Sequence, residues 1–205
     1  MAIDAYMFFQ KYSGSAAGDY LASESQVELQ TGGKDNPDMI KPFKDAYDKK
    51  FPNNRCGLFE IEDYSFDIEQ VLNIGSQSSG AGAGKVTFNP FSITRKIDCA
   101  SPQFFQMACS GTPFHTVSLG LRKSAGGTAS GLVFLMFTFR LVAVKTISWA
   151  HDDESPKETV TFEYGGLNIM YTQQKPDGSP VTPDPGGWNR VKNISADDLK
   201  TFVIA

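Results

Sequence analysis

The chain has 205 residues and a formal net charge of −4. A chain without a basic excess lacks the positive field that neutralises phosphates, so the composition argues against a nucleic-acid partner. The 16 phenylalanines and 19 glycines favour a strand-rich fold with many turns.

The cysteines and the apolar stretches indicate the cellular compartment of the chain. The three cysteines, Cys56, Cys99 and Cys109, are an odd number, which predicts free and mostly buried thiols in a reducing compartment. Asp4 stands where a signal peptide would carry positive charge, so we expect cytoplasmic synthesis and no signal peptide. The most apolar stretch, 132–144, is too short to span a bilayer, and we expect no membrane partner.

The amino-terminal quarter predicts one strand and a long insertion. Residues 3–10 (IDAYMFFQ) are rich in aromatic residues and predict the first strand. A polar, turn-rich segment follows, within which the alternating residues 25–30 predict a short strand. We interpret 19–57 as an inserted or extended loop between strands.

A helix is predicted inside this insertion, over about 42–50. Pro42 suits the first helical position, where its missing N–H costs nothing. Phe43, Ala46 and Tyr47 then fall on one helix face.

The next segments predict two strands around a glycine-rich loop. Residues 58–74 alternate between apolar and polar, but the parity switches, so we expect a bend near Asp63 or Asp67. Residues 75–84 are Gly- and Ser-rich and predict a loop. Residues 85–97 again predict a strand, with a bulge at its proline.

The clearest helix is predicted over about 101–110. Ser101 can cap its amino terminus, Pro102 suits the first turn, and Gly111 ends it. Its apolar face comprises Phe104, Phe105, Ala108 and Cys109.

Three long strands complete the pattern, at 115–123, 131–149 and 158–173. The Gly165-Gly166 pair in the last one predicts a bulge or a close backbone approach. The tail, 172–205, is rich in Pro and Gly and is expected to be loosely ordered.

The fold class that follows is mainly β. Because no strand–helix–strand alternation is present, an antiparallel sandwich or barrel in a single domain over 1–205 is the economical solution.

Residues 77–88 (QSSGAGAGKVTF) superficially match a phosphate-binding loop. The motif needs Gly five places before Gly84 and a hydroxyl after Lys85, but these positions are Ser79 and Val86. A strand is predicted after the loop, so no helix amino terminus faces a phosphate. We therefore expect no nucleotide and no other cofactor.

The candidate catalytic groups are few. His151 begins a polar HDDE run, which is typical of a solvated loop and gives a poorly preorganised metal site. His115 is close in sequence to Cys109, but we expect Cys109 to be a buried core thiol and not a nucleophile. Cys99 precedes a helix, whose amino terminus can lower a thiol pKa.

Carboxylates are dense around the bend predicted above, and they could pair as an acid and a base. They are more typical of a wet face or an edge protected by charge, so we expect no enzyme. The residues are Glu60, Glu62, Asp63, Asp67 and Glu69.

A resemblance joins these segments. Gly84-Lys85-Val86, the run SITRKID (92–98), Ala100-Ser101-Pro102, ACSG (108–111) and LGLRK (119–123) resemble the motifs of the Hcp (haemolysin-coregulated protein) family of bacterial type VI secretion systems. The first strand, residues 155–171 and the GGWNR run (186–190) are similar to the same family. Residues 19–57 are longer than the corresponding family segment.

The resemblance implies a β-barrel of two packed sheets with one short helix, assembled as a hexameric ring. Rings would stack into the inner tube inside a contractile sheath, carry a VgrG-type spike, and leave the cytoplasm by the type VI system. Small effectors could be carried in the lumen.

The resemblance also implies two sets of contact residues. The lumen-facing position is Ser65, flanked by Tyr64 and Phe66. The packing loop between subunits or rings comprises Ser78, Ser79, Gly80, Gly82, Gly84 and Lys85.

Other functions stay open at this stage. The aromatic side chains could line the pocket of a monomeric ligand-binding β-barrel. A phage-tail-tube-like protein would perform the same mechanical task as the type VI tube subunit.

Overall fold

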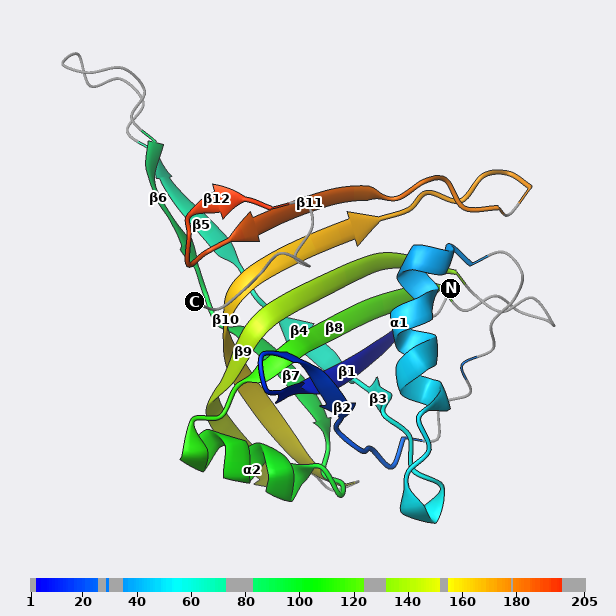
Figure 1. The fold of residues 1–205 in the computed structure, drawn as a ribbon, viewed down its shortest axis with the longest axis vertical. Helices are drawn as coiled ribbons and strands as arrows, with labels where there is room; N and C mark the ends of the chain where they lie inside the picture. The colour runs from blue at the N-terminus through cyan, green and yellow to red at the C-terminus, as the bar shows by residue number, and fades with distance from the viewer. Residues whose placement is uncertain are drawn as a thin grey trace.

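A computed structural model describes residues 3–25, 29, 35–72, 83–123, 132–151, 155–177 and 179–196. The expected mainly β fold is confirmed: antiparallel strands form a barrel that carries two helices (Figure 1). The strands are β1 (Ile3–Ser13), β2 (Ala16–Tyr20), β3 (Phe59–Glu60), β4 (Asp63–Ser65), β5 (Ile68–Leu72), β6 (Ala83–Phe88), β7 (Phe91–Lys96), β8 (Phe114–Lys123), β9 (Val133–His151), β10 (Pro156–Tyr171), β11 (Asp184–Asn189) and β12 (Ile194–Ser195). The helices are α1 (Pro37–Asp48) and α2 (Ser101–Ser110), with a 3-10 turn at Pro52–Asn54. In the described part of the chain, no helix has the length and apolar character needed to cross a bilayer.

The barrel is closed by one short segment. Strands β7, β10, β9, β8 and β1 pair in that spatial order. Glu60 of β3 then pairs with Tyr6 of β1, and Asp63 of β4 pairs with Thr94 of β7. The bend predicted near Asp63 lies between these two strands, and it lets the chain leave one edge of the sheet and join the other. Closure gives the edges of β1 and β7 a pairing partner.

Aromatic side chains fill the barrel core. Phe9 lies at its centre, with ring centroids 5.1 Å from Phe59, 4.9 Å from Phe104 and 5.2 Å from Phe114. Phe104 comes from α2, which closes one end of the barrel. Tilted and edge-to-face pairs of this kind add to the burial of apolar area.

Helix α1 covers the outer face of β1, β8 and β9 and builds a second core. Met39 and Phe43 are fully buried there against Tyr6 and Phe8 of β1. Alternation along β1 therefore sends neighbouring side chains into two different cores.

The predicted start of this helix was wrong. Asn36 caps it by accepting a hydrogen bond from the Asp38 N–H at 2.9 Å, and Pro37 takes the first position. Pro42 lies inside the helix, where one intrahelical hydrogen bond is lost because proline has no N–H. Burial of the apolar face outweighs this loss.

The predicted Gly-Gly feature of β10 lies where that strand changes partner. Residues 157–162 pair with β7, whereas 166–171 pair with β11. Gly165 lies between the two ladders. The register irregularity against β9 falls earlier, between Thr161 and Phe162.

The tail contains regular structure where the sequence suggested a loosely ordered segment. Strand β11 extends the sheet beyond β10, and β12 pairs with β11 in turn. Gly187 permits this because a Cβ atom there would lie 2.0 Å from the Ala196 carbonyl oxygen.

Helix α2 has the predicted bounds but not the predicted cap. Ala100 is the capping residue, and the Ser101 hydroxyl donates to Glu158 Oε1 at 2.9 Å instead. Gly111 ends the helix with a positive φ of 67°, as expected. Phe105 and Cys109 are exposed, because the helix buries only the stripe that faces the barrel.

A buried ion network ties α2 to two strands. The guanidinium of Arg95, on β7, pairs with Asp98 and lies 3.4 Å (Nε to Oε1) from Glu158 of β10. The Arg95 and Glu158 side chains are 2% and 0% exposed. The guanidinium also lies over the rings of Phe59 and Phe104, at 5.0 and 5.5 Å from their centroids.

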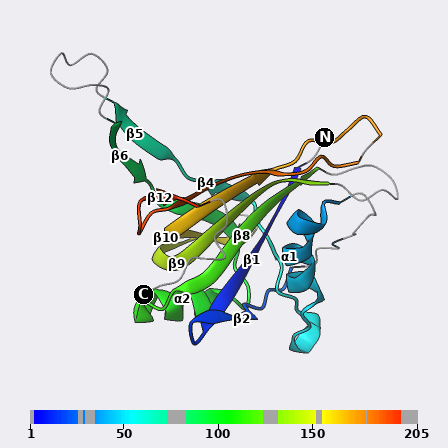
Figure 2. The same cartoon turned by 45° about the horizontal axis from the view of Figure 1, so that its top comes forward.

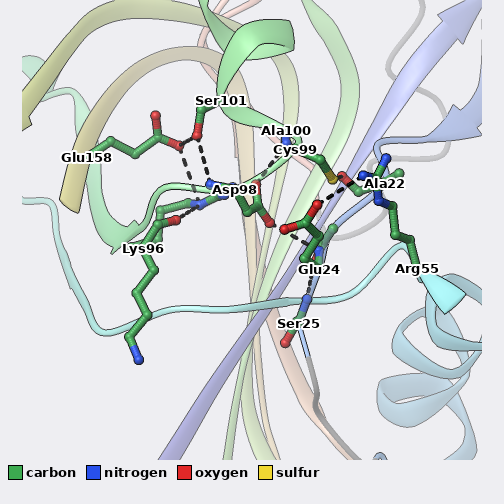
Figure 3. Close-up of polar contacts among 12 residues, drawn as sticks. Ala22, Glu24, Ser25, Arg55, Lys96, Asp98, Cys99, Ala100, Ser101 and Glu158 are labelled. Carbon is green, nitrogen blue, oxygen red and sulfur yellow. Dashed lines mark hydrogen bonds and ion pairs between the residues drawn. The ribbon is translucent and has the colours of Figure 1, made fainter. Parts of the chain in front are cut away.

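The carboxylates of this network have further partners, and Figure 3 draws those of Asp98 and the contact of Glu158 with Ser101. Asp98 accepts the backbone N–H of Ala100 at 2.8 Å and that of Glu24 at 3.1 Å. Glu158 accepts the indole N–H of Trp149 at 3.2 Å in addition to the Ser101 hydroxyl. The SITRKID and SP motifs are therefore explained by a structural anchor, since buried charges are tolerated only when paired and hydrogen-bonded.

The fit of α1 on the sheet predicts the effect of Gly120→Ala. A Cβ atom at Gly120 would lie 2.6 Å from Cζ of the fully buried Phe43 ring, so we expect a loss of about 1–3 kcal/mol in the free energy of unfolding. Urea unfolding measures it. Gly186→Ala is the matched control, because its Cβ meets nothing within 4 Å. An equal, small effect of both substitutions would contradict this account of the packing.

The network predicts the effect of Arg95→Ala. The substitution leaves the Glu158 carboxylate buried without its cation, which should lower the free energy of unfolding by about 3–5 kcal/mol. In the control, Arg55→Ala, the half-exposed pair with Glu24 is lost, which should cost less than about 1 kcal/mol. Denaturant titration of both variants would show whether burial decides the difference; similar losses would refute it.

Candidate functional site

The projecting hairpin is the most unusual element of the structure. Strands β5 and β6 pair only with each other among the described strands, and they leave the barrel as a two-stranded arm (Figures 1 and 2). At its base, Asn89 donates its backbone N–H to the Asp67 carbonyl at 3.1 Å and its side-chain amide to the Asp67 carboxylate at 2.6 Å. Figure 2 shows that the arm points away from both helices.

The residues expected to form the packing loop fall at this arm. Gly84 and Lys85 lie in β6, so a strand and not a helix follows the glycine-rich run. The strand predicted after the glycine-rich run is confirmed. Ser78, Ser79, Gly80 and Gly82 lie outside the described residues.

An apolar groove runs between the arm and the end of the sheet. Its volume is about 990 Å³, and one wall carries Ile68, Val86 and Phe88 of the arm. Leu167 and Ile169 of β10 and Trp188 of β11 form the opposite wall. Ile68 is 44% exposed. An exposed apolar surface of this kind marks a place where another molecule binds.

The three residues expected to face a lumen separate into two groups. Tyr64 and Phe66 are half-buried against the barrel core, and the Phe66 ring centroid lies 5.2 Å from that of Phe137. Ser65 is exposed on the opposite side of the same segment. Alternation along an extended strand explains this division.

Ser65 belongs to a surface of small polar side chains that the sequence analysis missed. Cross-strand pairing places two rows on one outer side of β4, β7, β10 and β9. Hydroxyl groups bond across the strands, Ser92 to Thr161 at 2.9 Å and Thr94 to Thr159 at 3.2 Å. We call this surface the hydroxyl face; its residues are Ser65, Ser92, Thr161 and Thr146 in one row and Asp63, Thr94, Thr159 and Ser148 in the other. The only signal in the sequence was the Ser/Thr alternation in each strand.

A second apolar surface lies beside the buried network. Phe105 and Trp149 are 51% and 53% exposed, and their ring centroids are 6.3 Å apart. With Ile97 and Pro102 they border a hollow of about 410 Å³. The adjacent pair Phe104-Phe105 was the available signal, because two consecutive helix residues cannot both face the barrel.

The structure does not assemble the histidines and cysteines into a catalytic group. Arg140 donates to Nδ1 of His115 at 2.9 Å, and burial together with this cation lowers the pKa of His115. Cys109 is exposed, contrary to the expected core thiol. Burial and the Asp98 carboxylate raise the pKa of Cys99 to about 11, so the helix amino terminus does not activate it.

The acidic residues also form separate contacts. Glu62 lies 3.3 Å from Lys157, and Asp67 binds Asn89. Among the described residues, no three His, Cys, Asp or Glu side chains converge as metal ligands. His151 ends β9, and 152–154 lie outside the described residues.

Comparisons with known proteins agree with this geometry. Residues 50–171 match the family model described as "Type VI secretion system effector, Hcp". A comparison with the curated proteins finds no match.

Solved structures share the fold. One described as a type six secretion system protein is 20% identical, with a TM-score of 0.68 over 95% of this chain and 100% of its own. Hcp1 from Salmonella typhimurium is 21% identical, with a TM-score of 0.60 over 96% and 100%. Hcp3 from Pseudomonas aeruginosa is 14% identical, with a TM-score of 0.53 over 92% and 98%. Because the family model covers more than half of the chain, the protein belongs to the Hcp family, the secreted tube-type proteins of the type VI secretion system.

Proposed function

We propose that this chain is the repeating subunit of the type VI inner tube. Six copies close into a ring, and rings stack into a tube that is expelled from the bacterial cytoplasm with a VgrG-type spike inside a contracting sheath. No signal peptide is needed for this route. The chain acts mechanically and catalyses no reaction.

One observation carries the proposal. The β5–β6 arm pairs with no other described strand, and the groove beside it exposes aliphatic and aromatic side chains. A two-stranded hairpin is at best marginally stable by itself, so packing against another copy would stabilise it. A head-to-tail contact of arm and groove generates a closed ring when its rotation closes.

The hydroxyl face supports a role in the lumen. It is a polar surface with small side chains, and it offers hydrogen-bonding groups without large apolar anchors. Such a surface would let a small effector pass or bind weakly inside a ring. We assign Ser65 to this surface, whereas Tyr64 and Phe66 support it from the barrel side.

A ligand-binding barrel is less well supported. Its interior would have to hold a cavity, but stacked rings such as Phe91 and Phe139, with centroids 4.6 Å apart, occupy it. A phage-tail-tube-like role would use the same surfaces and the same ring. The tube of a type VI system is favoured by the family match.

The mass in solution tests ring formation. Six copies of the 22.4-kDa chain give about 134 kDa by light scattering, and negative-stain images should show closed rings. Ile68→Asp places a charge on the exposed groove wall and should weaken assembly at least about tenfold, because the charge must be desolvated at the contact. Glu69→Gln, on the neighbouring position of the arm, should leave the mass unchanged. A monomer of about 22 kDa across the whole concentration range would contradict the proposal.

Thiol labelling tests the position of the hydroxyl face. In a background without the native cysteines, Ser65→Cys should react with a small maleimide in the assembled ring, but slowly with a maleimide attached to a protein too large for the lumen. Lys44→Cys, on the exposed side of α1, should react with both reagents. Equal rates of both thiols with the large reagent would place Ser65 outside the lumen.

A further inference from the structure

The orientation of the β5–β6 arm relative to the barrel requires contacts at the base of the arm. Along the chain, the arm continues into the barrel through the short connections at 66–67 and 89–90. A lone hairpin on two connections would swing about its base, because a two-stranded ladder contributes little stability of its own. The contacts at the base therefore determine the position of the groove wall that the arm forms.

Arg190 adds contacts to the Asn89–Asp67 hydrogen bonds at this base. Its Nη2 donates to the Phe88 carbonyl at 3.2 Å, at the end of β6, and its Nη1 donates to the Tyr164 carbonyl at 2.6 Å, on β10. Its backbone N–H donates to the Gly165 carbonyl at 2.9 Å. One side chain thus joins the arm to the place where β10 changes partner.

The same guanidinium lies against two aromatic rings. It is 5.2 Å from the Phe88 centroid and 4.7 Å from the Tyr164 centroid. Glu163 Oε2 lies 3.5 Å from Nη1 and adds a weaker, partly exposed ion pair. A flat, delocalised cation with several fixed donors can stack and bind two carbonyls at once, which a lysine ammonium cannot do.

The GGWNR run holds Arg190 in place. Gly187 lets β12 pack on β11, and Asn189, which is buried, accepts the Lys192 N–H at 2.9 Å in the turn that follows. Trp188 forms part of the groove wall. The run therefore shapes the strand end from which Arg190 reaches the arm.

We propose that Arg190 is the positioning residue of the arm: it fixes the direction of β5–β6 relative to β10–β11 and thereby the shape of the groove that receives another copy. The role in assembly rests on the proposed function, whereas the role in holding the arm does not. The end of β6 at Phe88, the place where β10 changes partner and the β11–β12 hairpin then meet at Arg190, and we call this contact region the Arg190 joint.

Hydrogen exchange of the purified chain tests this joint. In Arg190→Lys and Arg190→Met, the amides of residues 68–70 and 86–88 should exchange at least about tenfold faster than in the original chain, because the double carbonyl contact is lost. The amides of β8 should be unchanged. Lys145→Met is the matched control, since it removes the other cation beside Glu163, at 2.9 Å, without touching the arm. Unchanged exchange in the arm of both Arg190 variants would overturn the proposal.

A second variant covers the case in which the Arg190 variants unfold. Phe88→Leu keeps the carbonyl acceptor but removes the ring under the guanidinium, so a smaller increase in arm exchange is expected. No increase would overturn the proposal.

Ring mass, measured on the same samples, separates the two proposals. If the original chain is a monomer, the tube function fails, but the exchange result still decides the role of Arg190. If the original chain forms rings, the Arg190 variants should assemble at least about tenfold more weakly. Rings of undiminished stability with a loosened arm would refute the link between Arg190 and assembly.

Discussion

The rest of the structure depends on the burial of Arg95. A guanidinium inside a phenylalanine-rich barrel must meet its countercharges there, because an unpaired charge in that environment is costly. Its partners are Glu158 of β10 and Asp98 of the turn before α2, so the ion network fixes both elements against β7. The position of α2 in turn places Phe104 over Phe9 and closes the barrel core.

Closure of the barrel determines which surfaces stay accessible to other molecules. The segment that crosses from β1 to β7 pairs with both strands and closes the barrel, and aromatic rings occupy the interior. In the described part of the chain, the outer surface carries the apolar groove, the hydroxyl face and the exposed Phe105–Trp149 pair, which differ in chemistry. Helix α1 covers a further part of the outer sheet and so buries apolar side chains that would otherwise be exposed.

Two arginines perform related tasks at different depths. Arg95 lies over Phe59 and Phe104 inside the barrel, and Arg190 lies against Phe88 and Tyr164 at the base of the arm. Both join strands that are distant in the sequence, because a long side chain with a flat, multiply donating head can reach across a junction. The inner one secures the barrel, and the outer one directs the arm that leaves it.

Alternation, glycine and proline positions determined the strand-rich class, the bounds of α2 and the bend before β4, because these depend on a few neighbouring residues. The motif resemblance supplied the family. Other features follow only from contacts between distant segments. The early start of α1 depends on the burial of Met39 against the sheet. The exposure of Cys109 depends on which side of α2 faces the barrel. The regular structure of β11 depends on its pairing with β10. The groove, the hydroxyl face and the Arg190 joint belong to the same group, because each is assembled from strands far apart in the chain, and local sequence carries no information about which strands become neighbours.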